Sequence, residues 1–346
     1  MDEDMSRYQP PLTLTPRMLS LIAEISEQIG LLSAMDDRQQ TPQLRRGNRI
    51  RTIQASLAIE NNTLSIQQVT AVLAGQRVLG LPREIQEVRN AFAAYEAMAD
   101  WQPSHRADLL EAHELLMKGL IDDSGQLRRS GVGIYRGEKL VHMAPPPSRV
   151  AHLIEDLLAW LGNSDWHPLI TSCVFHYEFE FIHPFADGNG RMGRLWQTLI
   201  LSQWRPVLAY LPVEAVIREQ QDAYYAALSA ADQQAEGTPF VEFMLQALSL
   251  ALAEAARNEP STDQVTDQVT DQVAKLLRVL AGELPLKVNE LMAGLGLAHK
   301  ATFRANYLKP ALTAGLIEMT DPDSPRSPAQ RYRLTEQGKS MATRSR

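Results

Sequence analysis

Apolar residues recur at helical spacing along most of this chain of 346 residues, and this periodicity constrains the fold more than any other feature. After Thr15-Pro16, apolar positions follow the i, i+3, i+4, i+7 order of one helix face; they are Met18, Leu21, Ile22, Ile25, Ile29 and Leu32. Further amphipathic stretches are Leu44–Glu60, Ser65–Ala74, Pro82–Trp101, Ser104–Leu120, Arg149–Leu161, Pro168–Ile182, Gly190–Trp204, Ile217–Gln234 and Pro239–Asn258. The sequence therefore predicts a mainly α fold.

One segment departs from the helical pattern. Between Leu127 and Ser148, short alternating pieces surround Gly137, and Ala144-Pro-Pro-Pro147 follows them. Alternation of this length around a glycine and before prolines is typical of a small β-hairpin. We therefore predict one hairpin, at about residues 131–143, within a helical body.

Composition narrows the class of protein. With 45% hydrophobic residues, a chain of this length can bury a large core and hold two or three domains. The single cysteine, Cys173, lies in an apolar run and has no partner for an internal disulfide, which favours a reducing compartment. The sequence has no uninterrupted apolar stretch of about 18 residues and begins with the acidic Met1-Asp-Glu-Asp-Met5. We expect a cytoplasmic protein with no membrane partner.

A repeat divides the chain near residue 260. Thr262-Asp-Gln-Val265 occurs three times in succession up to Val273, and its four-residue period places the valines on nearly one helical face. We favour a linker at 259–273 over a self-association stripe. The predicted organisation is then an N-terminal helical region at 1–100, a core at 101–258, this linker, and a C-terminal domain at 274–346.

The C-terminal domain has its own pattern. Helical segments at 273–280, 288–292 and 300–314 precede two alternating segments at 316–320 and 330–334, an order that resembles a winged helix-turn-helix. Basic residues gather on the candidate recognition helix and the wing: Lys300, Arg304, Lys309, Arg326, Arg331 and Arg333. We expect them to meet the phosphates of DNA. The alternative is a dimerisation module of the same fold.

Charge is distributed unevenly. From Pro285 to the end, ten Lys and Arg stand against five Asp and Glu, a balance of +5, so the overall net charge of −7 leaves −12 for residues 1–284. A basic domain attached to an acidic body is the pattern expected when that domain meets a polyanion. A solvated surface is the plainer alternative.

The chemically informative segment is His183-Pro-Phe-Ala-Asp-Gly-Asn-Gly-Arg-Met-Gly-Arg194. Pro184 ends the preceding helix, and the glycines of Gly188-Asn-Gly190 allow a loop whose N–H groups point inward. The helix that begins near Gly190 adds its positive dipole end. The segment therefore predicts a cradle for phosphates.

The polar residues of this segment suit phosphate transfer. Asp187 is an oxygen ligand for Mg²⁺, which takes most of its other ligands from substrate phosphates. Arg191 and Arg194 lie three apart on the first helical turn and can both clamp developing charge. His183 titrates near neutrality, as a general base requires. Each residue alone has a structural explanation, but a packing role for the whole set is improbable.

The segment resembles the signature of the Fic family, His-Pro-Phe-x-acid-Gly-Asn-Gly-Arg-x-x-Arg, at every specified position. The flanks resemble the family too: His176–Ile182 is similar to the helix before the motif, and Met143–Pro147 with Val150–Trp160 is similar to the flap end and the next helix. The resemblance covers roughly residues 15 to 258.

This resemblance implies a protein adenylyltransferase that uses ATP and Mg²⁺. It implies His183 as the base that deprotonates a Tyr, Ser or Thr hydroxyl of a protein, including this chain itself, for attack on the α-phosphorus of ATP. The implied metal ligand is Asp187. The implied nucleotide-binding residues are Gly188, Asn189, Gly190, Arg191, Met192, Gly193, Arg194 and Tyr225, with Asp232 where relatives often carry Asn. The implied flap, which would add the target segment as a strand, presents Ile134, Tyr135, Leu140 and Val141.

A second motif refines this hypothesis. Ser56-Leu-Ala-Ile-Glu-Asn61 resembles the family's inhibitory motif, and Glu60 could form a bidentate pair with Arg194 that removes the γ-phosphate clamp. The alternative is that Glu60 merely ends a helix, because Asn61-Asn62 follows it. We predict that Glu60→Gly raises AMP transfer and that His183→Ala abolishes it. Glu60 could also position water for the removal of AMP.

Two alternatives remain from the sequence. Fic relatives also transfer phosphocholine or a phosphoryl group, although the intact Gly188-Asn189-Gly190 favours AMP. The other alternative is a DNA-binding regulator in which the Fic body senses a nucleotide. Relatives often dimerise, so a homodimer is a further expectation.

Overall fold

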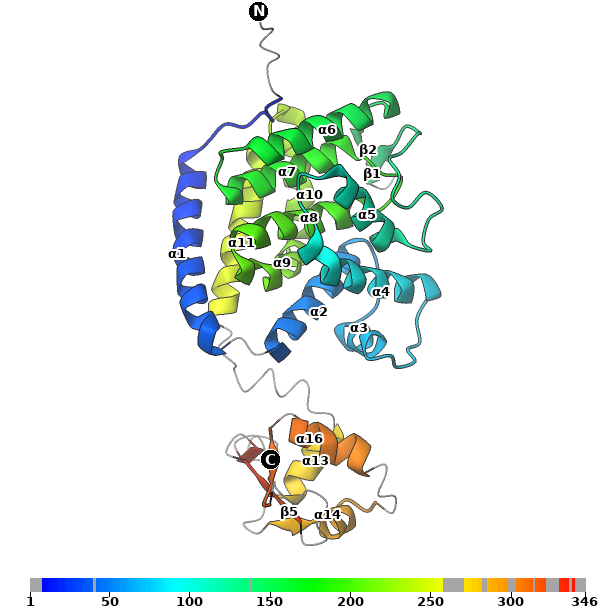
Figure 1. The fold of residues 1–346 in the computed structure, drawn as a ribbon, viewed down its shortest axis with the longest axis vertical. Coiled ribbons are helices and arrows are strands. Elements are labelled where there is room, and N and C mark those ends of the chain that lie inside the picture. Colours follow the sequence, from blue (N-terminus) through cyan, green and yellow to red (C-terminus); the bar gives the residue numbers. More distant parts are fainter. Residues whose placement is uncertain are drawn as a thin grey trace, which may run out of the picture. The chain divides into compact units, whose positions relative to one another are not determined.

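The computed structural model describes residues 8–39, 42–136, 139–257, 271–281, 285–297, 303–313, 315–321, 330–335 and 338–339. The chain divides into two compact units, Met1–Arg257 and Asn258–Arg346 (Figure 1). The division lies beside the predicted boundary at residue 258. The predicted boundary at residue 100 lies inside the first unit, whose helices share one hydrophobic core.

The first unit is mainly helical, as predicted. Its elements in chain order are α1 (Pro16–Gln39), α2 (Pro42–Ile59), α3 (Ile66–Leu73), α4 (Pro82–Ala97), η1 (Met98–Asp100), α5 (Arg106–Met117), β1 (Gly133–Arg136), β2 (Lys139–Met143), α6 (Pro147–Asn163), α7 (Pro168–Ile182), α8 (Asn189–Trp204), η2 (Pro206–Tyr210), α9 (Val213–Glu219), α10 (Gln221–Gln234) and α11 (Thr238–Arg257). The predicted single helix at 217–234 is wrong, because Gln220 leaves helical geometry with φ −109° and ψ 32° and separates α9 from α10.

Helices α7 and α8 pack against each other in the centre of this unit. Nearly every residue of α7 is buried, as expected for a helix with apolar residues on all sides. The rings of Phe175, Phe179 and Phe185 follow one another at centroid distances of 5.8 and 6.1 Å. This core fixes the two helix ends that flank the segment 183–189.

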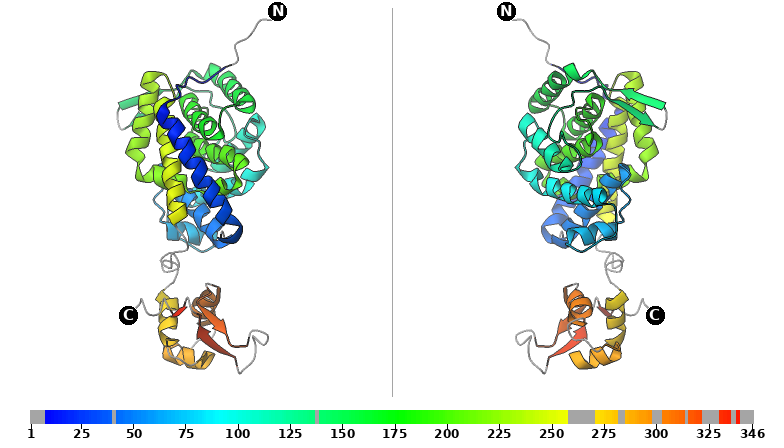
Figure 2. Two further views of the ribbon diagram at one scale, coloured as in Figure 1. Left: turned by 90° about the vertical axis from the view of Figure 1, so that its left-hand side faces the viewer. Right: turned by 90° about the vertical axis from the view of Figure 1, so that its right-hand side faces the viewer.

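The outer helix α1 runs along α11, as Figures 1 and 2 show in blue and yellow. Within α11, Thr238–Ala256 is long enough to span a membrane, with a mean hydropathy of 1.3 in its most apolar window. Half of that window is buried inside the protein, and α11 packs on α1, α7 and α10. A core helix meets the same length and hydropathy criteria.

The two strands β1 and β2 form the predicted hairpin. They pair antiparallel, Gly133 with Met143 and Arg136 with Lys139, and the register shifts between Ile134 and Tyr135. The side chains of residues 134–142 lie outside the described part. The hairpin backbone lies against α10.

The second unit has its own core and contains α13 (Asp271–Val279), β3 (Leu286–Lys287), α14 (Val288–Gly294), the π-helical turn η3 (Arg304–Leu308), α16 (Lys309–Thr313), β4 (Ile317–Met319) and β5 (Arg331–Leu334). The strands form an antiparallel sheet in the order β3-β5-β4. The predicted linker ends too late, because α13 begins at Asp271 and Val273 is buried. Residues 258–270, Lys300 and Arg326 lie outside the described residues.

Candidate active site

The loop between α7 and α8 begins with a strained residue. His183 ends α7 in the left-handed conformation, with φ +49° and ψ 62°, and its N–H donates to the Phe179 carbonyl. A non-glycine residue persists there only when its surroundings enforce the conformation, and such strain is common at functional sites. The backbone thus turns the His183 side chain out of the helical path.

A buried arginine from outside the loop holds this turn. Arg128 donates from Nε to the His183 carbonyl at 2.7 Å and from Nη2 to the Ile182 carbonyl at 3.3 Å. The same guanidinium donates to the carbonyls of Ser130 and Pro145, which lie on either side of the hairpin. Burial lowers its pKa. Arg128 therefore ties the candidate base and the base of the hairpin together.

The interior of the loop is also fixed by side chains. Asn189 binds both backbone groups of Phe185, accepting from its N–H and donating to its carbonyl, each at 2.9 Å. His113 stacks on the Phe185 ring, with centroids 3.6 Å apart. Because Gly125 N–H donates to His113 Nδ1 at 2.8 Å, Nε2 carries the proton and donates to the Asp187 carbonyl at 3.0 Å. Burial lowers the pKa of His113 to about 4.

The N-terminus of α8 lies at the segment for which the sequence predicted an anion cradle. Gly188 caps the helix with φ +86°, and a Cβ there would lie 2.6 Å from Met117 Sδ. The first N–H groups of α8, those of residues 189–191, have no partner within the helix and point toward its N-terminal end. The N–H of Met192 is already used by the Gly188 carbonyl at 3.0 Å, and the Met192 side chain is fully buried. Both the backbone N–H and the side chain of Met192 are thus used within the protein.

Arg194 is buried and is bound by the N-terminal helix α2. Its Nη2 donates to Glu60 Oε1 at 2.8 Å and to the Ser56 carbonyl at 3.1 Å, while its Nε donates to Ser56 Oγ at 3.0 Å. The predicted bidentate carboxylate pair is wrong in its geometry, because one carboxylate oxygen and Ser56 share the guanidinium. The sequence distance between the partners is 134 residues, yet the predicted pairing is present.

Glu60 also lies over the cradle itself. A Cβ built on Gly190 would collide with Glu60 Oε1 and come within 3.1 Å of Arg194 Nη1. Only glycine at this position lets the Glu60 carboxylate approach the start of α8. The carboxylate thus lies where an anion bound at the helix N-terminus would lie.

Sequence comparisons agree with this geometry. Residues 103–201 match the family model described as Fic/DOC family, and residues 271–335 match the one described as Filamentation induced by cAMP protein Fic-like, C-terminal domain. A crystal structure of a Fic family protein from Desulfovibrio desulfuricans G20 is 64% identical, covers 95% of this chain and 99% of that chain, and has a TM-score of 0.73. The chain belongs to the Fic family.

Several more distant relatives are named for an enzymatic activity. This Fic chain is similar to Protein adenylyltransferase Fic from Aedes aegypti, 28% identical over 212 residues, and from Drosophila virilis, 30% identical over 201 residues. The matches cover 56% and 55% of this chain but 39% of each relative, so the chain spans about two fifths of their length. Fic-1 from C. elegans (residues 134–508) shares the fold at 23% identity, with a TM-score of 0.55 and coverage of 71% and 73%.

The Fic loop has a second arginine with different partners. Arg191 is buried and binds Asp187 Oδ1 at 3.1 Å and Glu87 at 3.6 Å. Arg83 reaches the other Asp187 oxygen at 3.2 Å. In this arrangement Arg191 holds the acidic end of the loop, whereas the sequence predicted a clamp beside Arg194.

The candidate base has an acidic neighbour on its own helix. His183 Nδ1 lies 3.3 Å from the Glu180 carbonyl and 3.8 Å from its carboxylate. Acceptors beside Nδ1 favour the tautomer with its proton there, which leaves Nε2 basic. On the same helix, His176 Nδ1 faces Gln197 Oε1 at 2.7 Å, and Nε2 accepts from Tyr224 at 3.2 Å. Burial lowers the pKa of His176 to about 3.

The remaining predicted residues lie on α8, α10 and the hairpin. Tyr225 is half-buried on α10, and burial followed by the charge of Glu60 raises its pKa. Tyr177 donates to Asp232 at 3.3 Å. For Ile134, Tyr135, Leu140 and Val141 only the hairpin backbone is described. A Cβ on Gly193 would lie 2.8 Å from His176, so this glycine serves helix packing.

Sequence reasoning missed Arg128 and His113. Arg128 precedes the hairpin and shows no motif, and His113 occupies an apolar face of α5 where a buried structural histidine is common. Their roles depend on contacts 55 and 74 residues away in the sequence.

Proposed function

We propose that this Fic protein transfers AMP from ATP to Tyr, Ser or Thr hydroxyls of proteins, including itself. The observation that carries the proposal is that Arg194 Nη1 lies 3.1 Å from a Cβ built on Gly190 at the N-terminus of α8, and that His183 begins the loop that leads into this helix. A base, a phosphate cradle and a charge clamp are the groups that nucleotidyl transfer requires. The names of the adenylyltransferase relatives support the choice of AMP.

The proposed reaction is a displacement at the α-phosphorus. His183 Nε2 accepts the proton of the target hydroxyl as its oxygen forms a bond to the α-phosphorus, and the bond from that phosphorus to the bridging oxygen breaks. Pyrophosphate leaves with the electron pair. Arg194, once freed from Glu60, neutralises charge on the departing phosphates.

Asp187 is the residue that would hold Mg²⁺. Among the described residues no cluster of three or more His, Cys, Asp or Glu side chains could enclose a metal. A single carboxylate beside a phosphate cradle nevertheless fits Mg²⁺, which keeps waters and takes substrate phosphates as ligands. The bound ion would neutralise phosphate charge, and Asp187 would exchange part of its contact with Arg83 and Arg191 for it.

The hairpin supports a protein substrate. Strand β1 and strand β2 form an isolated two-stranded ribbon at the side of the loop, and a third strand can add to its edge through backbone hydrogen bonds. Such pairing would register a target hydroxyl next to His183. Strand pairing of this kind uses backbone hydrogen bonds, so target segments of different sequence can bind.

We propose further that the chain as described is in an inhibited state. Glu60 and Ser56 occupy the three described donor contacts of Arg194, and Glu60 Oε1 lies over Gly190. A γ-phosphate must displace this carboxylate to reach the guanidinium. Removal of Glu60 is therefore expected to raise AMP transfer.

Labelling with two forms of ATP tests the transferred group. Purified Glu60→Gly protein is incubated with lysate and with either α-³²P or γ-³²P ATP. The proposal expects label on protein from the α form alone, and none with Glu60→Gly/His183→Ala. Equal label from the γ form would indicate phosphoryl transfer and overturn the assignment of AMP.

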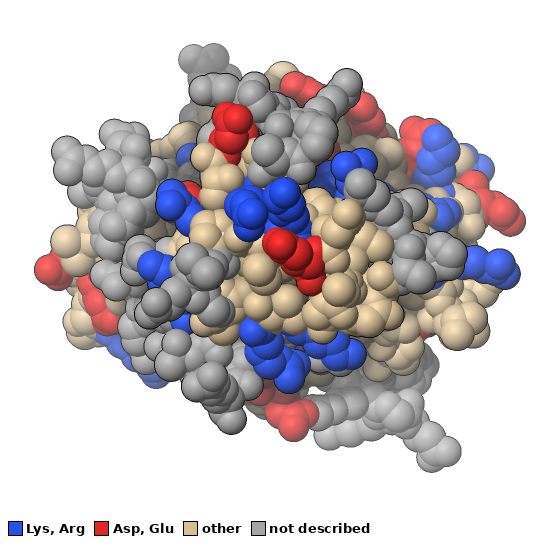
Figure 3. All heavy atoms as spheres, turned by 90° about the horizontal axis from the view of Figure 1, so that it is seen from below, with Lys and Arg blue, Asp and Glu red and all other residues tan. Residues whose placement is uncertain are grey.

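A second candidate function concerns the C-terminal unit. Arg304 and Lys309 are exposed on the helical segment that follows α14, ahead of the β4–β5 hairpin, and this element order favours DNA binding. The wing residues Arg331 and Arg333 instead pair with Glu290 and Glu318 at 3.7 and 2.6 Å. In Figure 3, acidic side chains lie beside basic ones on the part of the surface that is coloured by charge.

A salt-dependent mobility shift with DNA tests this candidate. Arg304→Glu/Lys309→Glu should lose the shift, and Arg331→Glu should change it less. Absence of any shift at low salt would contradict DNA binding. The cytoplasmic location and the homodimer stay predictions.

A further inference from the structure

A cavity of about 430 Å³ lies beside the N-terminal half of the inhibitory helix α2. Helix α4, η1, the end of α8 and η2 complete its walls, and the residues that matter here are Arg45, Arg49, Tyr95, Ala99 and Tyr210. Its volume falls within the range of small-molecule sites. None of the residues proposed above for nucleotide transfer lines it.

Arg49 is the central feature of the cavity. Its side chain is only 6% exposed and lies between two tyrosine rings, 4.9 Å from the centroid of Tyr95 and 5.0 Å from that of Tyr210. Nη1 donates to the Ala209 carbonyl at 3.2 Å, but Nε is buried without a hydrogen-bond partner in the described part of the chain. A buried cation with an unused donor is costly unless an anion is available.

No carboxylate in the described residues forms an ion pair with Arg49. The buried acid that interacts electrostatically with Arg49 is Glu214, and its Oε1 accepts a hydrogen bond from the Tyr95 hydroxyl at 2.9 Å. Burial raises the pKa of Glu214, while its hydrogen bonds and the charges of Arg194 and Arg49 lower it. The charge of Arg49 is therefore available to a ligand.

The cavity as a whole favours an anion. A second guanidinium, that of Arg45, lies 5.5 Å from the centroid of Tyr210, and Glu96 is the only acid among the described lining residues. Arginine donors in a fork suit carboxylate and phosphate oxygens. The wall also offers the hydroxyl of Ser202 and the amide of Gln203.

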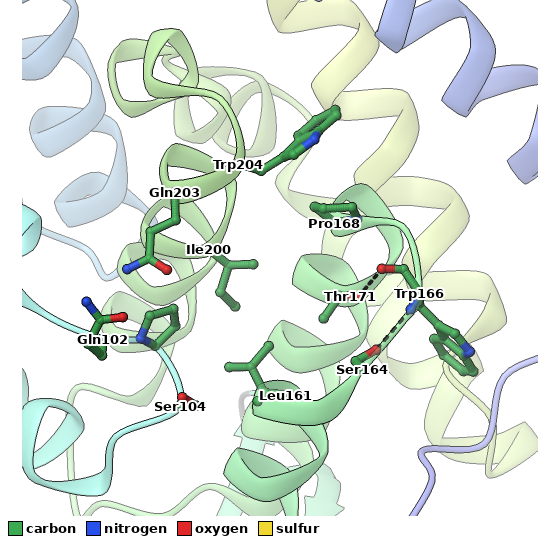
Figure 4. Close-up of a pocket in the computed structure, with 12 residues that line it drawn as sticks. Gln102, Ser104, Leu161, Ser164, Trp166, Pro168, Thr171, Ile200, Gln203 and Trp204 are labelled. Carbon is green, nitrogen blue, oxygen red and sulfur yellow. Dashed lines mark hydrogen bonds between the residues drawn. The ribbon is translucent and has the colours of Figure 1, made fainter.

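A neighbouring cavity provides a contrast. It has a volume of about 250 Å³ and shares Gln203 with the first, but its described lining contains no Lys, Arg, Asp or Glu (Figure 4). The side chains of Leu161, Ile200 and Thr171 line it, with Ser104 at one side. It has no feature that would select an anion.

We propose that the cavity at Arg49 binds a small organic molecule bearing a phosphate or carboxylate group, and that this ligand holds α2 in its inhibitory position. Arg45, Arg49, Ser56 and Glu60 follow one another on α2 and the residue after it, so fixing the first pair restrains the second. The part of this proposal that concerns regulation rests on the proposed AMP transfer. The part that concerns ligand binding is independent of it.

Binding is tested by calorimetric titration of the full chain with phenyl phosphate. Wild-type protein should bind it, whereas Arg49→Met, which removes the charge, and Ala99→Phe, which adds a ring at the exposed wall of the cavity and leaves both arginines, should lose binding. Ser104→Phe, which fills the neighbouring cavity, should bind as the wild type does. Circular dichroism melting selects variants that fold. Binding that survives in folded Ala99→Phe, or no binding by the wild type at millimolar concentration, overturns the site.

Regulation is tested by AMP transfer with and without phenyl phosphate. We expect about a fivefold lower rate in the wild type, a typical allosteric coupling, and no change in Glu60→Gly. Equal inhibition of both would place the ligand at the ATP site and overturn the regulatory half. Failure of the proposed enzymatic function would look different, because Glu60→Gly would then transfer no AMP under any condition.

Discussion

The charge of Glu60 can be separated from its bulk by the substitution Glu60→Gln. Glutamine keeps the size of the side chain and an oxygen that can accept from Arg194 Nη2, so the position over Gly190 stays filled. It loses the negative charge. Because Arg194 stays charged, its hydrogen bond to the glutamine oxygen remains, and only the attraction between opposite charges is lost. Solvent screens this attraction because the Glu60 side chain is 36% exposed, and such pairs contribute about 0.2 to 1 kcal/mol. The inhibited state should therefore lose at most about 1 kcal/mol.

That difference predicts a graded series. A loss of at most about 1 kcal/mol corresponds to a rise of at most about fivefold in the active fraction, and Glu60→Gly should exceed this because it also clears the cradle. Initial rates of self-modification with α-labelled ATP measure the order wild type, Glu60→Gln, Glu60→Gly. A rate for Glu60→Gln equal to that of the wild type would refute the electrostatic part. A rate equal to that of Glu60→Gly would refute the steric part.

Three further predictions concern the groups around the loop. Arg128→Met leaves buried carbonyls near His183 without donors and should lower the free energy of unfolding by about 3 kcal/mol, measured by urea denaturation, with little rescue by lysine. Glu180→Gln in the Glu60→Gly background should lower kcat about tenfold with little change in KM for ATP, and it should shift the pH profile of kcat. The pKa of His113 is about 4 when folded and about 6.5 when unfolded, so unfolding takes up a proton between these values. Its stabilisation is complete above pH 6.5 and falls by up to about 3 kcal/mol as the pH drops to 4, and melting curves of His113→Gln should show a weaker pH dependence.

The helical body and the catalytic segment could be predicted from the sequence because their information is local. Apolar spacing gives the helices, and residues 183–194 place a base, a loop and a helix start in direct succession. The pairing of Glu60 with Arg194 joins residues 134 positions apart and was predicted from a family resemblance rather than from a local pattern. The resemblance did not predict the detailed geometry, in which Ser56 and Glu60 share the Arg194 guanidinium.

The supports of the site could not be predicted because they depend on tertiary packing. Arg128 and His113 donate hydrogen bonds to backbone carbonyls, which every residue has. No pair of complementary side chains in the sequence therefore indicates these contacts. The different role of Arg191 follows from Glu87 on α4, which periodicity alone cannot position against α8. The break at Gln220 likewise lies within an apolar pattern that suits one continuous helix.

The central claim is that His183 directs AMP transfer and that Glu60 restrains it. Intact-mass measurement of the purified chain after incubation with ATP and Mg²⁺ tests both parts at once. The account predicts an added adenylyl group on Glu60→Gly, much less on the wild type, and none on Glu60→Gly/His183→Ala. An adenylyl group on the double variant, or equal modification of the wild type and Glu60→Gly, would contradict it.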